Sequence, residues 1–456
     1  MASVLLLLII VVGMMCGAYV FFKKEAMSPT FICTAMYSLS LFLMLLYSEE
    51  WDVQLSWKTY TIIIVALVFL WLGEYFAMRA TSAFGGKRLL SVFVDEDKKG
   101  QEALGIQLSE TSIAICFVFV ALTAILYLRD VQNIVANSEY AQSVYGQEYT
   151  FLRQFSWAQI LEGAEVSYFV QQMFTLSGVI AFVLSYVVIY NMVYGPRKRK
   201  KHPFAYITII VYVGTSFLTS GRALMLNFFI YCIFVWLILS AKKKNWSFNN
   251  NFKLLIRAAL IIVIAILIFY LAGILTGKTS SYANFMDNFA NYFSSSIYGL
   301  NEYLNNPSEF ISDTDFFGIH TLSGLYTLLR TLGFPIPDSI VALEYIECGD
   351  YLTNIYTPLR RYFQDFGWIG LCLIMFLIGY FYKRLVWKNK SKNSCGLDVI
   401  FAAYFMFPLV YIAIEERVFM DVIMMRSIYQ IIYIIFVYQW LVNRKFYTKR
   451  IQLRYA

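Results

Sequence analysis

The sequence predicts an all-α, polytopic integral membrane protein that forms one membrane domain over residues 1–456. Its mean hydropathy is +0.61, aromatic residues make up 18% of the chain, and only 14% of its residues are charged. This composition excludes a soluble globular protein of the same length. Lipid offers no partner to a free backbone group, and the apolar runs are too long for barrel strands, so we expect these runs to be helices.

Eleven apolar runs are candidate membrane spans, since about 20 residues are needed to cross ~30 Å of hydrocarbon. The runs cover residues 4–22, 29–47, 59–76, 110–128, 168–194, 203–220, 223–240, 254–276, 366–382, 398–414 and 427–442. The first run is not expected to be a cleavable signal peptide, because its positive residues Lys23 and Lys24 follow the apolar stretch.

Basic residues predict the orientation of the chain. The runs GPRKRKKH (195–202), KKKNW (242–246) and KRLVWKNKSK (383–392) fall in alternate loops. Placing these loops in the cytoplasm puts 27 of the 37 Lys and Arg residues inside and 10 outside, as the positive-inside rule requires. The N-terminus is then outside and the C-terminus cytoplasmic.

The net charge of +8 is explained by this orientation, and no nucleic-acid recognition module is visible. The sequence contains only two histidines, no Cys/His cluster with metal-ligand spacing and no phosphate-binding glycine loop. We therefore expect no nucleic acid, no metal and no cofactor. Eight of the ten outer cations are Arg, whose planar donor fork suits a carboxylate or a phosphate.

A long outer loop over residues 277–365 is expected to form part of the active site, because loops of this length are usually functional or disordered and this one is rich in aromatic residues. Within it, 282–300 has aromatic residues at helical spacing. That pattern fits a helix on the membrane surface or a loop helix packed on other helices. Segment 317–333 predicts a helix whose polar face either lines a cavity or faces water; this face carries His320, Ser323, Thr327 and Arg330.

The stretch TNIYTPLRRYFQDFGWIGL (353–371) places two arginines just before an apolar run. Thr357 is a plausible N-cap and Pro358 a first helical residue. The short helix that follows carries Arg360, Arg361, Gln364 and Asp365. A helix start has free N–H groups and a partial positive charge, so two arginines there predict an anion site. The alternative is a surface ion pair between Arg361 and Asp365.

Two further charged clusters are predicted on the outer side. TSGRA (219–223) places Arg222 in a tight turn between two spans, and EERVFMD (415–421) places Glu415, Glu416, Arg417 and Asp421 between the last two. Ionisable groups near membrane depth are expensive and often functional, although exposed charges in a turn would look the same. All of these clusters are expected on one side of the bilayer.

The block TNIYTPLRRYFQDFGWIG, with a long outer loop before it and a span after it, resembles the Wzy-type oligosaccharide repeat-unit polymerases of the bacterial O-antigen and capsule polymerase/ligase superfamily. The TSGRA turn is similar to a short element of the same superfamily. The resemblance implies a GT-C-like membrane glycosyltransferase. It would polymerise undecaprenyl-diphosphate-linked repeat units into O-antigen or capsular polysaccharide on the outer face of the bacterial inner (plasma) membrane. The implied partners are lipid-linked donor and acceptor, membrane lipids and a chain-length regulator protein.

The resemblance implies that Arg222, Arg360 and Arg361 bind the diphosphate and that Asn354 and Tyr356 shape the sugar site. The outer charge pattern adds Arg330 and Arg417 as diphosphate candidates. Three residues are candidates for the catalytic base, with the acidic turn at 415–416 favoured: Glu416, Asp365 and His320. An O-antigen ligase usually has a His where this chain has Thr353, which disfavours the ligase. The alternatives are an O-antigen ligase or a peptidoglycan-type polymerase, a lipid-linked oligosaccharide flippase, and a structural or sensory membrane protein.

Overall fold

The computed structural model is helical almost throughout and contains one two-stranded sheet within the residues that it describes. These are residues 1–83, 105–139, 151–195, 202–219, 221, 223–244, 246, 270–271, 285–310, 316–336, 340, 342–349, 351–391 and 394–443. The predicted all-α class is confirmed.

The described helices, in chain order, are α1 (Ala2–Phe21), α2 (Pro29–Leu46), α3 (Trp57–Ala83), α4 (Glu110–Asn137), α6 (Phe151–Glu162), α7 (Tyr168–Tyr194), α8 (Pro203–Phe217), α9 (Ala223–Lys243), α11 (Phe285–Asn305), the 3-10 helix η2 (Pro307–Phe310), α12 (Ser323–Thr331), α13 (Pro358–Lys390), α14 (Gly396–Phe405), α15 (Phe407–Tyr411), α16 (Val418–Val422) and α17 (Met425–Leu441). Strands β1 (Ile346–Cys348) and β2 (Tyr351–Thr353) form an antiparallel hairpin.

Seven of the described helices are long and apolar enough to cross a membrane: α1, α2, α3, α4, α7, α9 and α13. Large apolar side chains are exposed on their outer surfaces, as in Leu6 and Ile9 of α1 and Val118 and Ile125 of α4. A membrane-embedded protein is therefore supported. Three more predicted spans correspond to shorter helices, namely α8, α14 with α15, and α17. The predicted span 254–276 lies outside the described residues except at 270–271, so the count of eleven stays a prediction.

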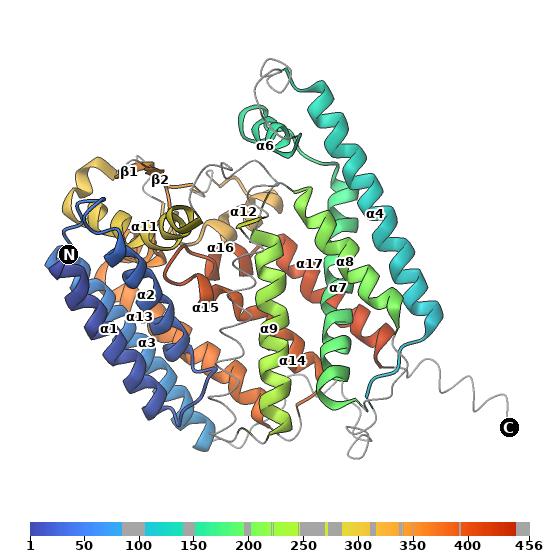
Figure 1. The fold of residues 1–456 in the computed structure, drawn as a ribbon, viewed down its shortest axis with the longest axis horizontal. Coiled ribbons are helices and arrows are strands. Elements are labelled where there is room, and N and C mark those ends of the chain that lie inside the picture. Colours follow the sequence, from blue (N-terminus) through green and yellow to red (C-terminus); the bar gives the residue numbers. More distant parts are fainter. Residues whose placement is uncertain are drawn as a thin grey trace.

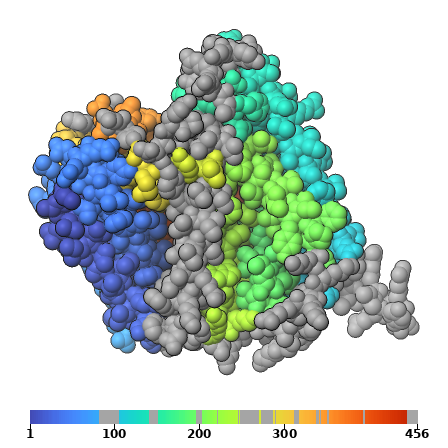
Figure 2. Space-filling model, in the orientation of Figure 1, coloured from blue at the N-terminus to red at the C-terminus, as the bar shows by residue number. Residues whose placement is uncertain are grey.

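The helices form two groups (Figure 1). Helices α1, α2, α3 and α13 pack together on one side, and α4, α7, α8 and α17 on the other, with α9 and α14 between them. Figure 2 shows both groups on one face of the molecule, with α1 and α2 in blue on the left and α8 and α9 in green on the right. The elements of the long loop, α11, α12 and the hairpin, lie at the end of the bundle where α1 begins. One end of the molecule therefore carries the loop.

Helix α11 packs against other helices. The Ser40 hydroxyl of α2 donates to the carbonyl of Phe293 at 2.6 Å, and the Ser296 hydroxyl donates to the carbonyl of Ala413 at 2.6 Å. Both serines of these bonds are buried. Of the two interpretations of 282–300, the packed loop helix is the one that the structure supports.

Helices α3 and α13 make the most extensive contact in the described structure. Two glycines allow their backbones to approach closely. A Cβ atom at Gly73 would lie 1.9 Å from the Phe376 carbonyl oxygen, and one at Gly379 would lie 2.1 Å from the Leu70 carbonyl oxygen. Small residues at such crossings are typical of membrane helices, where close packing replaces the hydrophobic effect.

A buried ion cluster joins this helix pair to the α1–α2 connection. Lys383 of α13 lies 2.9 Å from Glu25 and 2.9 Å from Glu74 of α3. Glu74 also accepts hydrogen bonds from the Ser28 hydroxyl at 2.7 Å and the Thr30 N–H at 2.9 Å. Lys390 lies 2.7 Å from Glu25. Two cations therefore balance two carboxylates, which is how charges are tolerated at such depth.

We expect Lys383→Met to destabilise the protein strongly, because it leaves Glu74 and Glu25 without their shared cation. Breaking a buried ion pair from one side costs about 3–5 kcal/mol, so the thermal unfolding midpoint in detergent should fall clearly. Lys390→Met is the matched control, since the Lys390 side chain is 32% exposed and its ion pair among the described residues is with Glu25. Equal midpoints for the two variants would contradict this role.

Candidate active site

Helix α13 begins as the sequence predicts. Thr357 is the N-cap and Pro358 the first residue, although the Thr357 side chain makes no capping hydrogen bond. The helix is interrupted at Gly367, whose φ of 60° and ψ of −157° are not helical. The backbone there is one that glycine adopts readily. The predicted short helix and the predicted span are thus two parts of α13 separated by a bend.

Arg360 is fully buried in an aromatic cage. Its guanidinium carbon lies 4.0 Å from the ring centroid of Tyr356 and 4.9 Å from those of Tyr303 and Phe310. Its Nη2 atom donates to the Glu344 carboxylate at 2.5 Å, and the Glu344 side chain is 42% exposed. The Nε and Nη1 atoms of Arg360 have no hydrogen-bond partner among the described residues. The buried cation therefore depends on one partly exposed carboxylate and on cation–π contacts.

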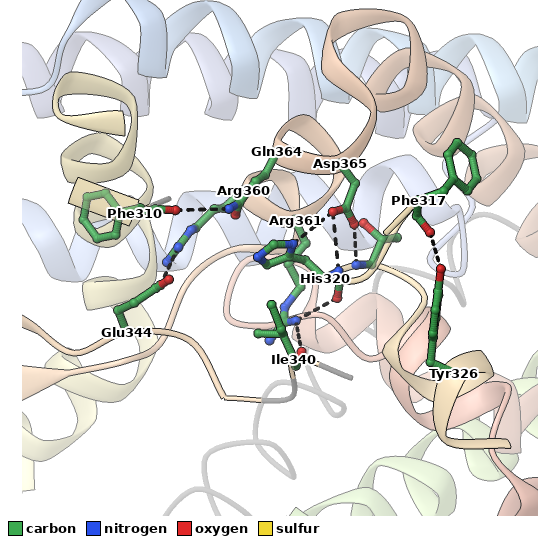
Figure 3. Close-up of polar contacts among 11 residues, drawn as sticks. Phe310, Phe317, His320, Tyr326, Ile340, Glu344, Arg360, Arg361, Gln364 and Asp365 are labelled. Carbon is green, nitrogen blue, oxygen red and sulfur yellow. Dashed lines mark hydrogen bonds and ion pairs between the residues drawn. The ribbon is translucent and has the colours of Figure 1, made fainter. Parts of the chain in front are cut away.

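Arg361 is also buried, but it points elsewhere (Figure 3). Its Nη1 atom donates to the carbonyl oxygens of His320 at 2.7 Å and Ile340 at 2.8 Å. The alternative prediction of an exposed ion pair between Arg361 and Asp365 is wrong, because both side chains are buried. Instead, Arg361 ties the loop to the start of α13.

Asp365 and His320 form a buried pair (Figure 3). Asp365 Oδ1 lies 3.0 Å from His320 Nδ1, and Oδ2 accepts from the Thr321 N–H at 2.6 Å. A carboxylate only accepts, so Nδ1 carries the proton and Nε2 presents its lone pair. His320 Nε2 is buried without a hydrogen-bond partner among the described residues, as are the hydroxyls of Thr321 and Ser323. This is the arrangement of an oriented general base with unfilled polar groups beside it.

The segment that holds His320 differs from the predicted helix over 317–333. Helix α12 begins only at Ser323, and turns occupy the residues before it. The residues of the predicted polar face do not share one environment, so they form neither a cavity lining nor a solvent-exposed face. His320 and Ser323 are buried, whereas Arg330 is exposed at the end of α12. The turns explain the difference, because they allow His320 to reach Asp365.

Glu416 is buried in the turn before α16. One of its oxygens accepts from the N–H groups of Val418 and Phe419 at 2.8 Å and from the Tyr362 hydroxyl at 3.1 Å. The other accepts from the Met420 N–H at 2.8 Å. Burial raises the pKa of Glu416 to about 6, against the lowering effect of these hydrogen bonds and of Arg361. Both oxygens are occupied, which favours a structural role over that of a base.

Arg417 is bound within its own turn. It lies 2.5 Å from Glu415 and 3.0 Å from Asp421. These two carboxylates raise the pKa of Arg417 despite its burial. Two carboxylates thus face one guanidinium, and the arrangement leaves Arg417 less available to a diphosphate than the sequence suggests.

The remaining predicted residues have different positions. Tyr356 is buried, and its hydroxyl donates to the Glu344 carbonyl at 3.0 Å while its ring covers Arg360. Asn354 is partly buried in the segment between β2 and α13. Arg222 lies outside the described residues, so its predicted part in binding the diphosphate stays a prediction. Arg360 and Arg361, its predicted partners in that role, contact different groups. The short connection between α8 and α9 agrees with the predicted turn.

The sequence analysis missed the residues around Arg360. Glu344 stands in a part of the loop without a motif, and Tyr303 and Phe310 resemble the many other aromatic residues of the chain. A buried arginine requires an anion, but no spacing rule identifies which carboxylate supplies it. No group of three or more His, Cys, Asp or Glu residues is placed to hold a metal in the described part of the chain.

Comparison of the chain with family models, curated proteins and solved structures gave no significant match.

The raised pKa of Glu416 predicts a pH effect on stability. The folded state binds this proton more tightly than the unfolded state, so lowering the pH from about 7 to about 5 should stabilise the fold by about 1 kcal/mol through this group. Glu416→Gln should remove that increment. The measurement is the thermal midpoint of both proteins at the two pH values, and the difference between them isolates Glu416. An unchanged pH dependence in Glu416→Gln would contradict the prediction.

Proposed function

We propose that the protein is a membrane glycosyltransferase that polymerises undecaprenyl-diphosphate-linked oligosaccharide repeat units into O-antigen or capsular polysaccharide, at the outer face of the bacterial plasma membrane. The observation that carries the proposal is the buried Asp365–His320 pair beside Arg361, with the buried Nε2 atom of His320 left without a hydrogen-bond partner among the described residues. The resemblance of residues 353–370 to polysaccharide polymerases supplies the substrate class.

The position of the pair supports a lipid-linked substrate. Asp365 stands two residues before the bend at Gly367, next to the predicted membrane span 366–382. A lipid diphosphate has its charged group at the membrane surface and its tail in hydrocarbon. A base held close to that surface meets the reacting bond without drawing the lipid out of the bilayer.

In the proposed reaction, His320 Nε2 accepts the proton of a hydroxyl on the acceptor sugar. The hydroxyl oxygen forms a bond to the anomeric carbon of the donor, and the bond from that carbon to the diphosphate oxygen breaks. Undecaprenyl diphosphate leaves with the electron pair. Asp365 stabilises the imidazolium that forms on His320, as a carboxylate behind a histidine base does.

Arginine supplies the charge for the leaving group. Arg360 has two N–H positions free of partners among the described residues, and its one carboxylate partner is on a partly exposed side chain. A diphosphate carries more charge than Glu344 and offers several acceptor oxygens, so it is a stronger partner for the guanidinium. Donor binding would then replace the Glu344 contact, and electrostatic stabilisation of the leaving group would follow.

The proposal is tested with purified protein and a lipid-linked oligosaccharide. A polymerase yields a ladder of lipid-linked chains, whereas a ligase transfers its chain to a different acceptor. Cells that lack the protein should accumulate single lipid-linked repeat units at the outer face. Accumulation at the inner face would support the flippase instead and would overturn the proposal.

His320→Gln should slow chain elongation by about 10²–10⁴-fold, the range that a positioned base contributes. Asp365→Asn should also slow it, because the amide no longer fixes the Nδ1 proton. His202→Gln is the control, since His202 is the other histidine and precedes α8. Elongation rates are measured with purified variants of equal thermal midpoint. A His320→Gln variant as fast as His202→Gln would exclude His320 as the base.

Glu344→Gln should tighten binding of undecaprenyl diphosphate, because Arg360 then has no competing carboxylate. A charge-assisted hydrogen bond contributes about 1.5–3 kcal/mol, so we expect a Kd lower by roughly tenfold or more. Titration calorimetry in detergent measures it. Glu347→Gln, at an exposed position of β1, should leave Kd unchanged. Weaker binding by Glu344→Gln would show that Glu344 supports the site and does not compete for it.

A further inference from the structure

The part of α13 beyond the bend carries an exposed apolar stripe. Ile369, Leu373, Leu377 and Phe381 follow at steps of four and are 85%, 55%, 52% and 50% exposed. Residues four apart share one face of a helix. Because this helix is apolar enough to cross a membrane, the stripe is the face that contacts lipid.

The stripe begins at Ile369, two residues after the bend at Gly367. The part of α13 between the bend and its first charged residue there, Lys383, is residues 368–382. It spans about 22 Å at a rise of 1.5 Å per residue, which covers most of the ~30 Å of a hydrocarbon core. Trp368 is 42% exposed at one end of this length, and tryptophan is typical of the interface between hydrocarbon and water. The membrane boundary is therefore expected at the bend.

A pair of exposed aromatic residues from the long loop lies beside the bend. Phe317 is 76% exposed and Phe316 is 53% exposed, and the ring centroid of Phe317 lies 5.0 Å from that of Phe366. The next residue, Gly318, has a φ of 71°, and a Cβ atom there would lie 2.8 Å from the Phe366 ring. The Tyr326 hydroxyl donates to the Phe317 carbonyl at 2.7 Å. The loop is thus fixed against α13 while the Phe317 ring faces outward.

We infer that Phe316 and Phe317 form a membrane anchor, which enters the lipid interface next to Trp368 and extends the lipid-facing stripe of α13 into the loop. Lipid is the partner that fits, because the anchor is apolar, is fixed at the expected boundary and adjoins a surface that already faces the bilayer. The inference does not depend on the proposed reaction.

The anchor fixes the depth of the candidate site. The Leu322 N–H donates to the Gly318 carbonyl at 2.7 Å, so His320 lies within the turn that follows Phe317. Asp365 approaches the same turn from the other side of the bend. Both members of the pair are therefore expected at the level of lipid phosphate groups.

Photo-crosslinking in full-length protein tests the anchor without requiring activity. Phe317, Leu373 and Leu352 are each replaced by p-benzoylphenylalanine, and the variants are irradiated in nanodiscs of phosphatidylethanolamine and phosphatidylglycerol. Leu373 is the lipid-facing reference. Leu352 of β2 is the matched control, since it is apolar and 67% exposed but lies in the hairpin. Lipid adducts are measured by mass spectrometry.

We expect lipid adducts at positions 317 and 373 to exceed those at position 352 several-fold. Adducts at 317 should lie nearer the glycerol than those at 373, because the anchor is at the boundary. A yield at 317 no higher than at 352 would overturn the inference, as would crosslinking of 317 to a second polypeptide. Absence of polymerase activity from the unsubstituted protein, with lipid crosslinking at 317 intact, would reject the proposed function and leave the anchor standing.

Discussion

Two adjacent guanidinium groups buried at the start of α13 impose the arrangement of the outer loop. A charge removed from water requires partners, and the long loop supplies a carboxylate to Arg360 and two carbonyl groups to Arg361. Successive residues on a helix point about 100° apart, so Arg360 and Arg361 collect partners from different directions. Arg360 contacts three aromatic rings and pairs with Glu344, whereas Arg361 donates hydrogen bonds to two carbonyl groups. The loop is thereby fixed to α13 at two points.

This constraint divides the acidic residues of the region into separate roles. Glu344 balances Arg360, Glu416 accepts hydrogen bonds at the start of α16, and Glu415 with Asp421 neutralises Arg417. Asp365 alone is directed to a histidine. Such a distribution distinguishes carboxylates that stabilise the fold from the one that is placed to orient a base. Arginines that gather on one side of a membrane protein therefore need not form one large anion site, because separate carboxylates can pair with them.

Composition and periodicity predict much of this fold, because membrane spans are specified by local runs of apolar residues. The start of α13 at Pro358 and the short α8–α9 connection follow from local signals in the same way. Other features depend on contacts between distant residues. No pattern near His320 indicates a turn in place of a helix, and none near Arg360 indicates Glu344. The predicted polar face of 317–333 failed because burial, which periodicity does not report, decided where His320 and Ser323 lie.

The ion cluster at Lys383 has a consequence for the biogenesis of the protein. Glu74 belongs to the third helix made, but its cation is 309 residues further along the chain. While the intervening helices are synthesised, the Glu74 carboxylate of α3 lacks its final counter-ion. The first three helices are therefore incomplete as an isolated unit, and their assembly is finished only when a helix from the last quarter of the chain arrives.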